Sequence, residues 1–390
     1  MGNNVSRKIF LLSFSIVIVM IGYGVIIPLF PFLIDNFGAE GKHLGLILAV
    51  AAFAQFIFAP FWGSLSDRVG RKPVLMIGML GNAISLLSFA IYPKLWMLFL
   101  SRVISGILSS AMIPTSSAYI SDITSDEERG DGIAKISGAM GLGVIIGPGI
   151  GGWIGQIFLV MPFYIASFFS MVSFLLIYIF LPETIDRKEE RNLENGYFLN
   201  QMNQMKAAML SPLWALLLLS MLNGFGSSSF QGIFGMYSLM KFNYNPTQIG
   251  LILMTVGIVA SIVQFAITGK LIKKLGEKRL MRIALFGSSF GFFIMTMATS
   301  MYTVLLTTSV FVFAKTMLRP SIASLLSKEN DNFGQGVVMG LNNSFMSIGN
   351  IIGPIWAGYF FDINIEIPYI SGAVIMALGF FLISRFNRAL

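Results

Sequence analysis

Lys315 and Arg319 are two cations, four residues apart, in a stretch that is otherwise apolar or small, FVFAKTMLRPSIA at 311–323. On a helix this spacing places both side chains on one face. Cations in such a setting predict an anion-binding site, and a lysine held away from water can also carry a proton. Two structural alternatives stand beside this hypothesis. Arg319 braces helix ends near Pro320, and Lys315 extends along its helix toward water.

The composition indicates a membrane protein. Of 390 residues, 55% are hydrophobic and only 11% are charged, whereas a soluble domain carries about 25% charged residues. The mean hydropathy is +0.79. Cysteine is absent and His43 is the single histidine, which argues against disulfides, thiol chemistry, a metal cluster or a Ser-His catalytic site. We therefore expect no cofactor and no metal.

Long apolar runs predict an all-α polytopic fold with twelve transmembrane helices, each near the ~20 residues that a bilayer requires. The expected limits are 9–34, 44–63, 74–93, 95–121, 133–156, 159–181, 211–237, 248–269, 280–299, 302–327, 336–360 and 367–385. The first run is too long for a signal-peptide core and fits a retained span.

The lysines and arginines predict the orientation. Twenty of the 26 fall in segments that lie inside if both termini are cytoplasmic, and three fall outside: Lys42, Lys94 and Lys241. The positive-inside rule therefore predicts cytoplasmic termini in the cell membrane. Arg102, Lys315 and Arg319 remain within the spans. Because topology explains most of the net charge of +8, nucleic acid is not an expected partner.

The chain reads as two related halves. The polar segment 183–210 divides the spans into bundles at 1–182 and 211–390, and we interpret it as a cytoplasmic linker with one surface helix at most. GVIIGPGIGG at 143–152 returns as GNIIGPIWAG at 349–358, an offset of 206 that also carries Pro114 to Pro320. Duplicated six-helix halves are typical of transporters that rock about a central site. The alternative is two similar but purely structural bundles.

The segment GSLSDRVGRK, at 63–72, lies in the expected cytoplasmic turn between spans two and three. Asp67 beside Arg68 and Arg71 predicts an ion-pair network, with Asp122 at the end of span four as a further partner. Such a network would hold one conformation and release in another. A solvated basic turn that only enforces orientation is the alternative.

Two glycine-proline pairs, Gly147-Pro148 and Gly353-Pro354, lie within spans five and eleven. Proline removes one helix hydrogen bond and glycine permits close helix packing. These pairs predict either bending points for alternating access or fixed kinks.

The chain resembles the major facilitator superfamily along its whole length. The segment 63–72 is similar to the loop motif of that family, LFLSRVISG at 98–106 is similar to its span-four motif with a buried arginine, here Arg102, and GVIIGPGIGG is similar to the span-five motif of its drug:proton antiporters. GYGVIIPLFPFLI at 22–34, MPFYIAS, FNYNPTQIG, LRPSIAS and NIIGPIWAG resemble the NorA/Bmr-type multidrug exporters. The resemblance implies two six-helix bundles, drug export, protons as the coupling ion, and a coupling or structural role for Arg102.

Span seven carries polar and aromatic side chains at helical spacing, which predicts a face toward a substrate cavity or, alternatively, polar contacts between helices. The candidate substrate residues are Asn223, Ser227, Phe230, Gln231, Phe234, Tyr237, Lys315 and Arg319. The candidate coupling or gating residues are Asp35, Asp67, Arg68, Arg71, Arg102, Asp122, Gly147, Pro148, Gly353 and Pro354.

All 18 acidic residues map to loops or span ends, with Asp35 closing span one. The relatives that the resemblance implies carry an acid in span seven and another in span ten, where this chain has Gln231 and Thr316. The remaining intramembrane charge is positive, which favours neutral, zwitterionic or anionic substrates over lipophilic cations.

We therefore expect a monomeric transporter that exports small amphipathic molecules across the lipid bilayer. A dedicated exporter or flippase for an anionic metabolite or lipid is the alternative. A receptor or a membrane enzyme has little support, because neither a soluble sensory domain nor a catalytic cluster is evident. The phosphate-binding motif G-x-x-x-x-G-K-[ST] is also absent, which argues against ATP-driven pumping.

Overall fold

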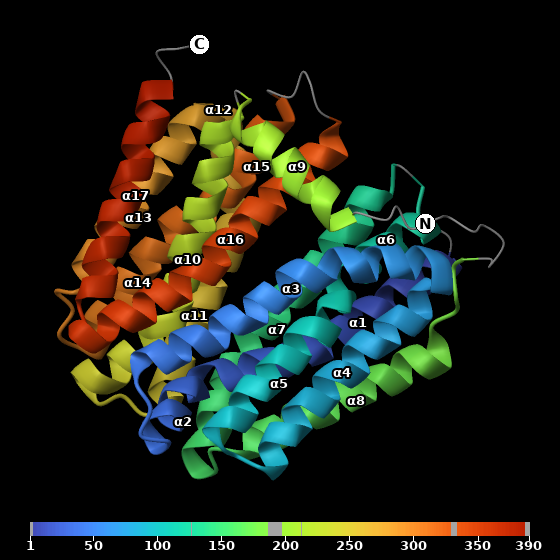
Figure 1. Ribbon diagram of the computed structural model, residues 1–390, viewed down its shortest axis with the longest axis horizontal. Helices are drawn as coiled ribbons and strands as arrows, with labels where there is room; N and C mark the ends of the chain where they lie inside the picture. The colour runs from blue at the N-terminus through green and yellow to red at the C-terminus, as the bar shows by residue number, and fades with distance from the viewer. Residues whose placement is uncertain (1–2, 126, 186–196, 212, 329–333, 387–390) are drawn as a thin grey trace. The chain divides into compact units, whose positions relative to one another are not determined.

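A computed structural model describes residues 3–125, 127–185, 197–211, 213–328 and 334–386, and these residues form helices and their connections without a strand (Figure 1). This confirms the predicted all-helical fold. Each expected span coincides with one helical segment. In chain order the segments are α1 (Asn3–Ile26) with η1 (Ile27–Leu29) and α2 (Phe30–Asn36), α3 (Gly41–Val69), α4 (Arg71–Ile91), α5 (Leu95–Leu108) with η2 (Ser109–Ala111) and α6 (Met112–Ile123), α7 (Arg129–Ile157), α8 (Met161–Phe180), α10 (Trp214–Phe242), α11 (Pro246–Ile262) with η3 (Val263–Ile267) and α12 (Thr268–Leu275), α13 (Glu277–Met295), α14 (Met301–Thr316) with α15 (Leu318–Lys328), α16 (Gln335–Ile363) and α17 (Ile367–Phe386).

Two of the interrupted spans are broken by prolines at equivalent places. Pro114 follows η2 by three residues, and Pro320 follows the break at Met317 by three. A proline cannot donate to the carbonyl four residues earlier and its ring crowds that carbonyl. Those carbonyls belong to Ser110 and Thr316, which lie at the two breaks. The offset of 206 thus relates a structural feature as well as a sequence motif.

The lengths and apolarity of the helices fit a multi-pass membrane protein. Nine segments of the described chain are long and apolar enough to cross a membrane, and a tenth is counted if α10 is taken together with the helix that precedes it. α13 carries three basic residues in its first two turns, and it is not among these nine segments. It still aligns with the ninth expected span.

The chain divides into two compact units. Unit 1 comprises residues 1–38, 50–195 and 245–254, and unit 2 comprises residues 39–49, 196–244 and 255–390. Two helices are shared, because the first nine residues of α3 belong to unit 2 and the first nine of α11 belong to unit 1.

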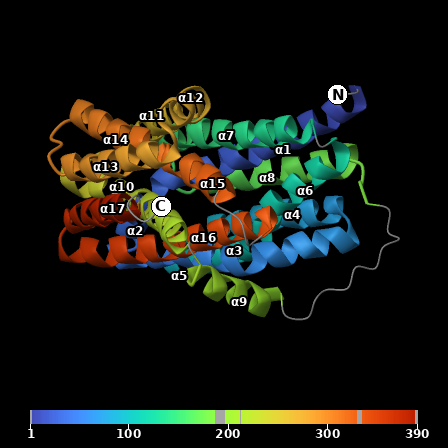
Figure 2. The ribbon, with the colours of Figure 1, turned by 90° about the horizontal axis from the view of Figure 1, so that it is seen from above.

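One further helix, α9 (Tyr197–Met209), lies in the expected linker. It lies beside α16 (Figure 2) and contacts α10 and α16, and its Met205 and Ala208 are buried. The preceding part of the linker, 186–196, lies outside the described residues.

Candidate functional site

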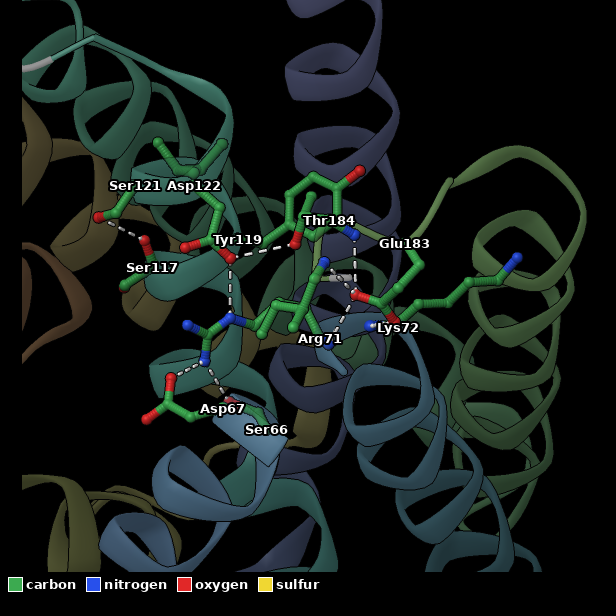
Figure 3. A network of polar contacts seen from close by, with 12 residues as sticks. Ser66, Asp67, Arg71, Lys72, Ser117, Tyr119, Ser121, Asp122, Glu183 and Thr184 are labelled. Atoms are coloured by element: carbon green, nitrogen blue, oxygen red, sulfur yellow. Dashed lines mark hydrogen bonds and ion pairs between the residues drawn. The ribbon is translucent and has the colours of Figure 1, made fainter. Parts of the chain in front are cut away.

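Arg71 is the centre of a polar network in unit 1 (Figure 3). Its Nη1 lies 2.5 Å from a carboxylate oxygen of Asp67, four residues earlier at the end of α3, and also donates to the hydroxyl of Ser66 at 2.7 Å. Its Nε donates to Asp122 at 2.9 Å. The side chain of Arg71 is only 9% exposed. The structure therefore brings together Asp67, Arg71 and Asp122, with a nearly buried guanidinium between two carboxylates.

The carboxylate of Glu183 caps the start of α4 in the same network. The residue before this helix is Gly70, at φ 107°, which has no side chain to cap the exposed amides. Glu183 accepts the main-chain N–H of Arg71 at 2.9 Å and that of Lys72 at 3.1 Å. A negative charge at a helix N-terminus satisfies free donors and interacts favourably with the helix dipole. A Cβ at position 70 would collide with this carboxylate, so the glycine permits both the turn and the cap.

The segment after α8 is attached to the network at two further points. Thr184 donates its hydroxyl hydrogen to Asp122 at 3.0 Å, and Tyr119 of α6 donates to the main-chain oxygen of Pro182 at 3.0 Å. The segment that follows α8 thereby holds the start of α4 and the end of α6 together. Sequence reasoning missed Glu183 and Thr184. One signal for a cap from elsewhere was available in the sequence. The helix α4 begins after a glycine and has no acidic residue in its first turn.

Two other candidates of this group stand apart from the network. Arg68 makes no ion pair with another residue of the described chain, and it is half-buried. Asp35 is exposed at the end of α2, where its main-chain oxygen accepts the N–H of Gly38. Neither side chain contacts the Arg71 network.

Unit 2 has an equivalent ion pair with the charges reversed. Glu277 begins α13 as Arg71 begins α4, and it lies 2.5 Å from the Nζ of Lys328. It also accepts a hydrogen bond from Ser324 at 2.8 Å. The hydrogen bond from Lys328 lowers the pKa of Glu277 below its ordinary value, against the smaller opposing effect of burial. The offset of 206 takes Asp122 to Lys328, so the sequence contained the signal for this pair.

Lys315 and Arg319 do not lie on one uninterrupted helix. α14 ends at Thr316, Met317 forms a turn, and Arg319 belongs to α15. Lys315 is half-buried and Arg319 is exposed. Within the described chain neither forms an ion pair with an acid, and the charged group that acts on Lys315 is Arg319, of the same sign. Span ten thus carries two cations that form no ion pair with any described acid.

The aromatic candidates of α10 are core residues of unit 2. Phe230 is 4% exposed and Phe234 and Tyr237 are 2% exposed. The ring of Phe230 lies 5.1 Å from that of Phe311 in α14, and the ring of Tyr237 lies 4.4 Å from that of Tyr369 in α17. These contacts pack α10 against its neighbours α14 and α17.

The polar candidates of α10 are divided between two environments. Gln231 is exposed and Ser227 is half-buried, and they lie one turn apart. Asn223 is 4% exposed, and its Oδ1 is buried without a hydrogen-bond partner in the part of the chain that the structure describes. The single stripe expected for span seven is thus a buried aromatic face with a smaller accessible polar face beside it.

Arg102 is buried in unit 1, with 4% of its surface exposed. Its guanidinium lies 5.6 Å from the centre of the Phe30 ring, a distance at which a cation and an aromatic face attract. The Nε and Nη2 atoms are buried and meet no acceptor within the described chain. A buried cation with unused donors is costly.

The glycine-proline helices cross the two shared helices at glycines. A Cβ added to Gly152 of α7 would collide with the main-chain oxygen of Pro246 in α11, and one added to Gly250 would collide with that of Pro148. α7 passes through Pro148 without interruption. The second helix of this crossing is the part of α11 that belongs to unit 1.

The equivalent crossing in unit 2 joins α16 to the start of α3. A Cβ on Gly45 would collide with the main-chain oxygen of Pro354, and one on Gly358 would collide with that of Gly41. Asp362 accepts the N–H of Gly41 at 2.7 Å and so caps the first turn of α3. The internal repeat relates the two crossings. At each of them the glycine position has room for a hydrogen atom but not for a Cβ.

Gly147 and Gly353 permit close contacts with other helices of their own halves. A Cβ at Gly147 would meet the main chain of Gly24 in α1, and a Cβ at Gly353 would meet Ser228 and Phe225 in α10. These contacts give both glycine-proline pairs a packing role, whether or not they also bend.

Comparison with known proteins gives matches along the whole chain. The family profile described as "Major Facilitator Superfamily" matches residues 12–222 and 216–388. "Multidrug resistance protein 2" of Bacillus subtilis (strain 168) is 32% identical over 378 residues, which are 96% of this chain and 94% of that protein. "Quinolone resistance protein NorA" of Staphylococcus aureus (strain N315) is 30% identical over 376 residues, which are 96% and 94% of the two chains.

Solved structures share the fold at lower identity. A bacterial homologue of the human lysosomal transporter Spinster, in an inward-facing and unoccupied conformation, aligns with a TM-score of 0.81 at 14% identity, over 99% of this chain and 98% of that one. The human organic anion transporter MFSD10 aligns with a TM-score of 0.73 at 22% identity, over 97% and 99%.

Proposed function

Since this chain belongs to the Major Facilitator Superfamily and is a multi-pass membrane transporter rather than an enzyme, we propose that it exports drugs and other small amphipathic molecules from the cell. The observation that carries this proposal is the full-length similarity to bacterial proteins named for multidrug and quinolone resistance. The family match confirms the resemblance that the loop, span-four and span-five motifs predicted.

The proposed topology places both termini in the cytoplasm of a bacterial cell, because 20 of the 26 lysines and arginines then lie inside. The proposed energy source is the proton gradient, and the proposed working unit is the monomer. In this topology the Arg71 and Glu277 ion pairs both lie at the cytoplasmic ends of their bundles.

The proposed substrate-binding residues in unit 2 are the accessible polar ones, namely Lys315, Arg319, Gln231 and Ser227. Lys315 and Arg319 have no acidic partner within the described chain, so an anionic or polar substrate group would supply the missing charge. Lys315 is also the proposed proton carrier, because it can release a proton when a cation or apolar group approaches. The positive charge of Lys315 and Arg319 favours neutral, zwitterionic or anionic substrates.

The proposed coupling elements are the Arg71 network and the two glycine crossings. An ion pair at the end of a helix bundle can be broken and remade as the transporter alternates between states. Asp67, Asp122 and Glu183 all contact Arg71, so displacement of α6 or of the segment after α8 would disrupt the network. Arg102 is a further proposed coupling residue because its donors are unused.

A dedicated exporter of an anionic metabolite or lipid is the second candidate. It is favoured by the unpaired cations of span ten, which suit one strongly anionic ligand as well as many weakly polar ones. The breadth of the substrate range distinguishes the two candidates.

The decisive experiment is transport by the purified chain in liposomes, with and without an imposed pH gradient. A panel of matched size should include a cationic dye, a zwitterionic quinolone, a neutral drug and an anionic compound. We expect gradient-dependent export of several members and weak export of the dye. Strong export of the dye alone would contradict the charge argument, and export of a single anion would favour the second candidate.

A further inference from the structure

An apolar cavity of about 360 Å³ lies in unit 2 between α11, α13 and α14. α14 contributes a regular stripe that includes Leu306, Val310 and Phe313, Met317 in the turn after α14 continues it, and Ile283 of α13 also lines the cavity. Leu306, Phe313 and Ile283 are 65%, 42% and 50% exposed, so the cavity opens to the surface. This volume is in the range of sites that hold small ligands.

The cavity is distinct from the proposed substrate residues. Its lining includes one polar side chain, Ser309, and neither Lys315 nor Arg319. On α14 the lining residues recur every three or four positions, which is one face of a helix, and Lys315 lies outside that series. An apolar groove that opens on the surface of a membrane-spanning helix faces lipid tails.

A cluster of cations lies at the predicted cytoplasmic end of the same groove. Arg279 precedes Ile283 by four residues and Gly287 by eight, so all three lie along one face of α13, and Ile283 and Gly287 line the groove. Arg279 is exposed. The Nε of Arg282 is buried and has no hydrogen-bond partner within the described chain.

Within the described residues, Glu277 forms an ion pair with neither Arg279 nor Arg282. Residues 270–282 contain six cations, namely Lys270, Lys273, Lys274, Lys278, Arg279 and Arg282, and one acid, Glu277. Glu277 is engaged by Lys328 and Ser324. Glu329 and Asp331 lie outside the described residues.

We propose that this groove binds one anionic phospholipid of the cytoplasmic leaflet, with an acyl chain along Ile283, Val310 and Met317 and the phosphate at Arg279 and Arg282. Basic residues next to the cytoplasmic ends of transmembrane helices attract anionic headgroups, and each contributes about 1 kcal/mol. Arginine matches the geometry of a phosphate with paired donors. The groove accommodates the apolar half of the same lipid, which a positively charged loop by itself would not do.

Native mass spectrometry of the full-length chain in detergent tests this site. The probes are dioleoylphosphatidylglycerol and dioleoylphosphatidylcholine, which have the same acyl chains and differ in headgroup charge. We expect the wild-type chain to retain the anionic lipid preferentially. Arg279→Gln and Arg282→Gln should each weaken its retention about fivefold, and Arg279→Lys should keep most of it.

A second variant separates the groove from the charge. Val310→Trp fills the groove and leaves every cation in place, so it should reduce retention of both lipids. Lys94→Gln removes a cation at the opposite end of the chain's spans and is the matched control, expected to bind as wild type does. Thermal unfolding of each variant confirms that it is folded, and Val310→Phe replaces Val310→Trp if the latter is not.

Three results would overturn the site. The first is equal retention of the two lipids by the wild-type chain. The second is an unchanged lipid ratio in Arg279→Gln/Arg282→Gln. The third is wild-type retention in the folded groove variant, which would show that the cations attract lipid without the cavity. Transport activity is not required for any of these readouts.

Discussion

Arg71 and Glu277 begin α4 and α13, occupy equivalent positions in the two halves, and carry opposite charges. Each pairs with a residue 51 positions further along the chain, Arg71 with Asp122 at 2.9 Å and Glu277 with Lys328 at 2.5 Å. The repeat has therefore kept the place of an ion pair and reversed its polarity. The fold requires two opposite charges at this place, and it accepts either arrangement of the cation and the anion.

Charge reversal of the second pair tests this interpretation. Glu277→Lys or Lys328→Glu alone should lower the unfolding temperature of the purified chain, because a mostly buried charge then faces a like charge. The double variant should recover most of the loss, with a coupling free energy of about 0.5–3 kcal/mol. Reversal of the exposed pair Glu40 and Lys42 is the control and should have little effect. Additive single effects at 277 and 328 would refute the pairing.

The same pair predicts a pH dependence of stability. The pKa of Glu277 is lowered, first by the hydrogen bond from Lys328, and the unfolded value is about 4.3. A lowered carboxylate pKa stabilises the fold above the unfolded pKa, and this stabilisation is lost as the pH falls through the folded value. The stability difference between wild type and Glu277→Gln should be constant near neutral pH and disappear in acid. A difference that persists below both values would contradict the assignment.

The glycine crossings predict that a glycine-to-valine substitution affects stability and transport only at certain positions. Gly152→Val in α7 and Gly358→Val in α16 would force apart helices that touch at main-chain atoms, with a cost of about 1–3 kcal/mol each or more. Gly138→Val in α7 and Gly340→Val in α16 are matched controls, because a Cβ at either glycine meets no atom within 4 Å. Thermal unfolding and transport should both distinguish the pairs. Equal losses in tests and controls would show that the crossings are not tight.

The two cations of span ten predict the charge of the preferred substrates. Lys315→Ala should reduce export of an anionic substrate by about tenfold, the value of a charge-assisted hydrogen bond, while Lys94→Ala, a change of the same type outside the spans, should not. Thr316→Asp in the Lys315→Ala background should increase export of a cationic dye. Initial rates in liposomes measure both effects. Equal losses for Lys315→Ala and Lys94→Ala would remove Lys315 from the substrate path.

The sequence by itself determined the helical segments and the family. These properties depend on local composition and on repetition, since about 20 apolar residues must form a helix to cross a bilayer wherever the neighbouring helices lie. Lys315 and Arg319 were also visible as cations within a predicted span, because residue types alone show the charge of a segment.

Tertiary structure decided which of these residues meet. Glu183 caps α4 from 112 residues away, and α3 gives its first turns to unit 2 while α11 gives its first turns to unit 1. The aromatic candidates of α10 proved to be core residues because helical spacing identifies a shared face and not what covers it. Contacts between distant segments depend on packing in three dimensions. They cannot be read from the order of residues along the chain.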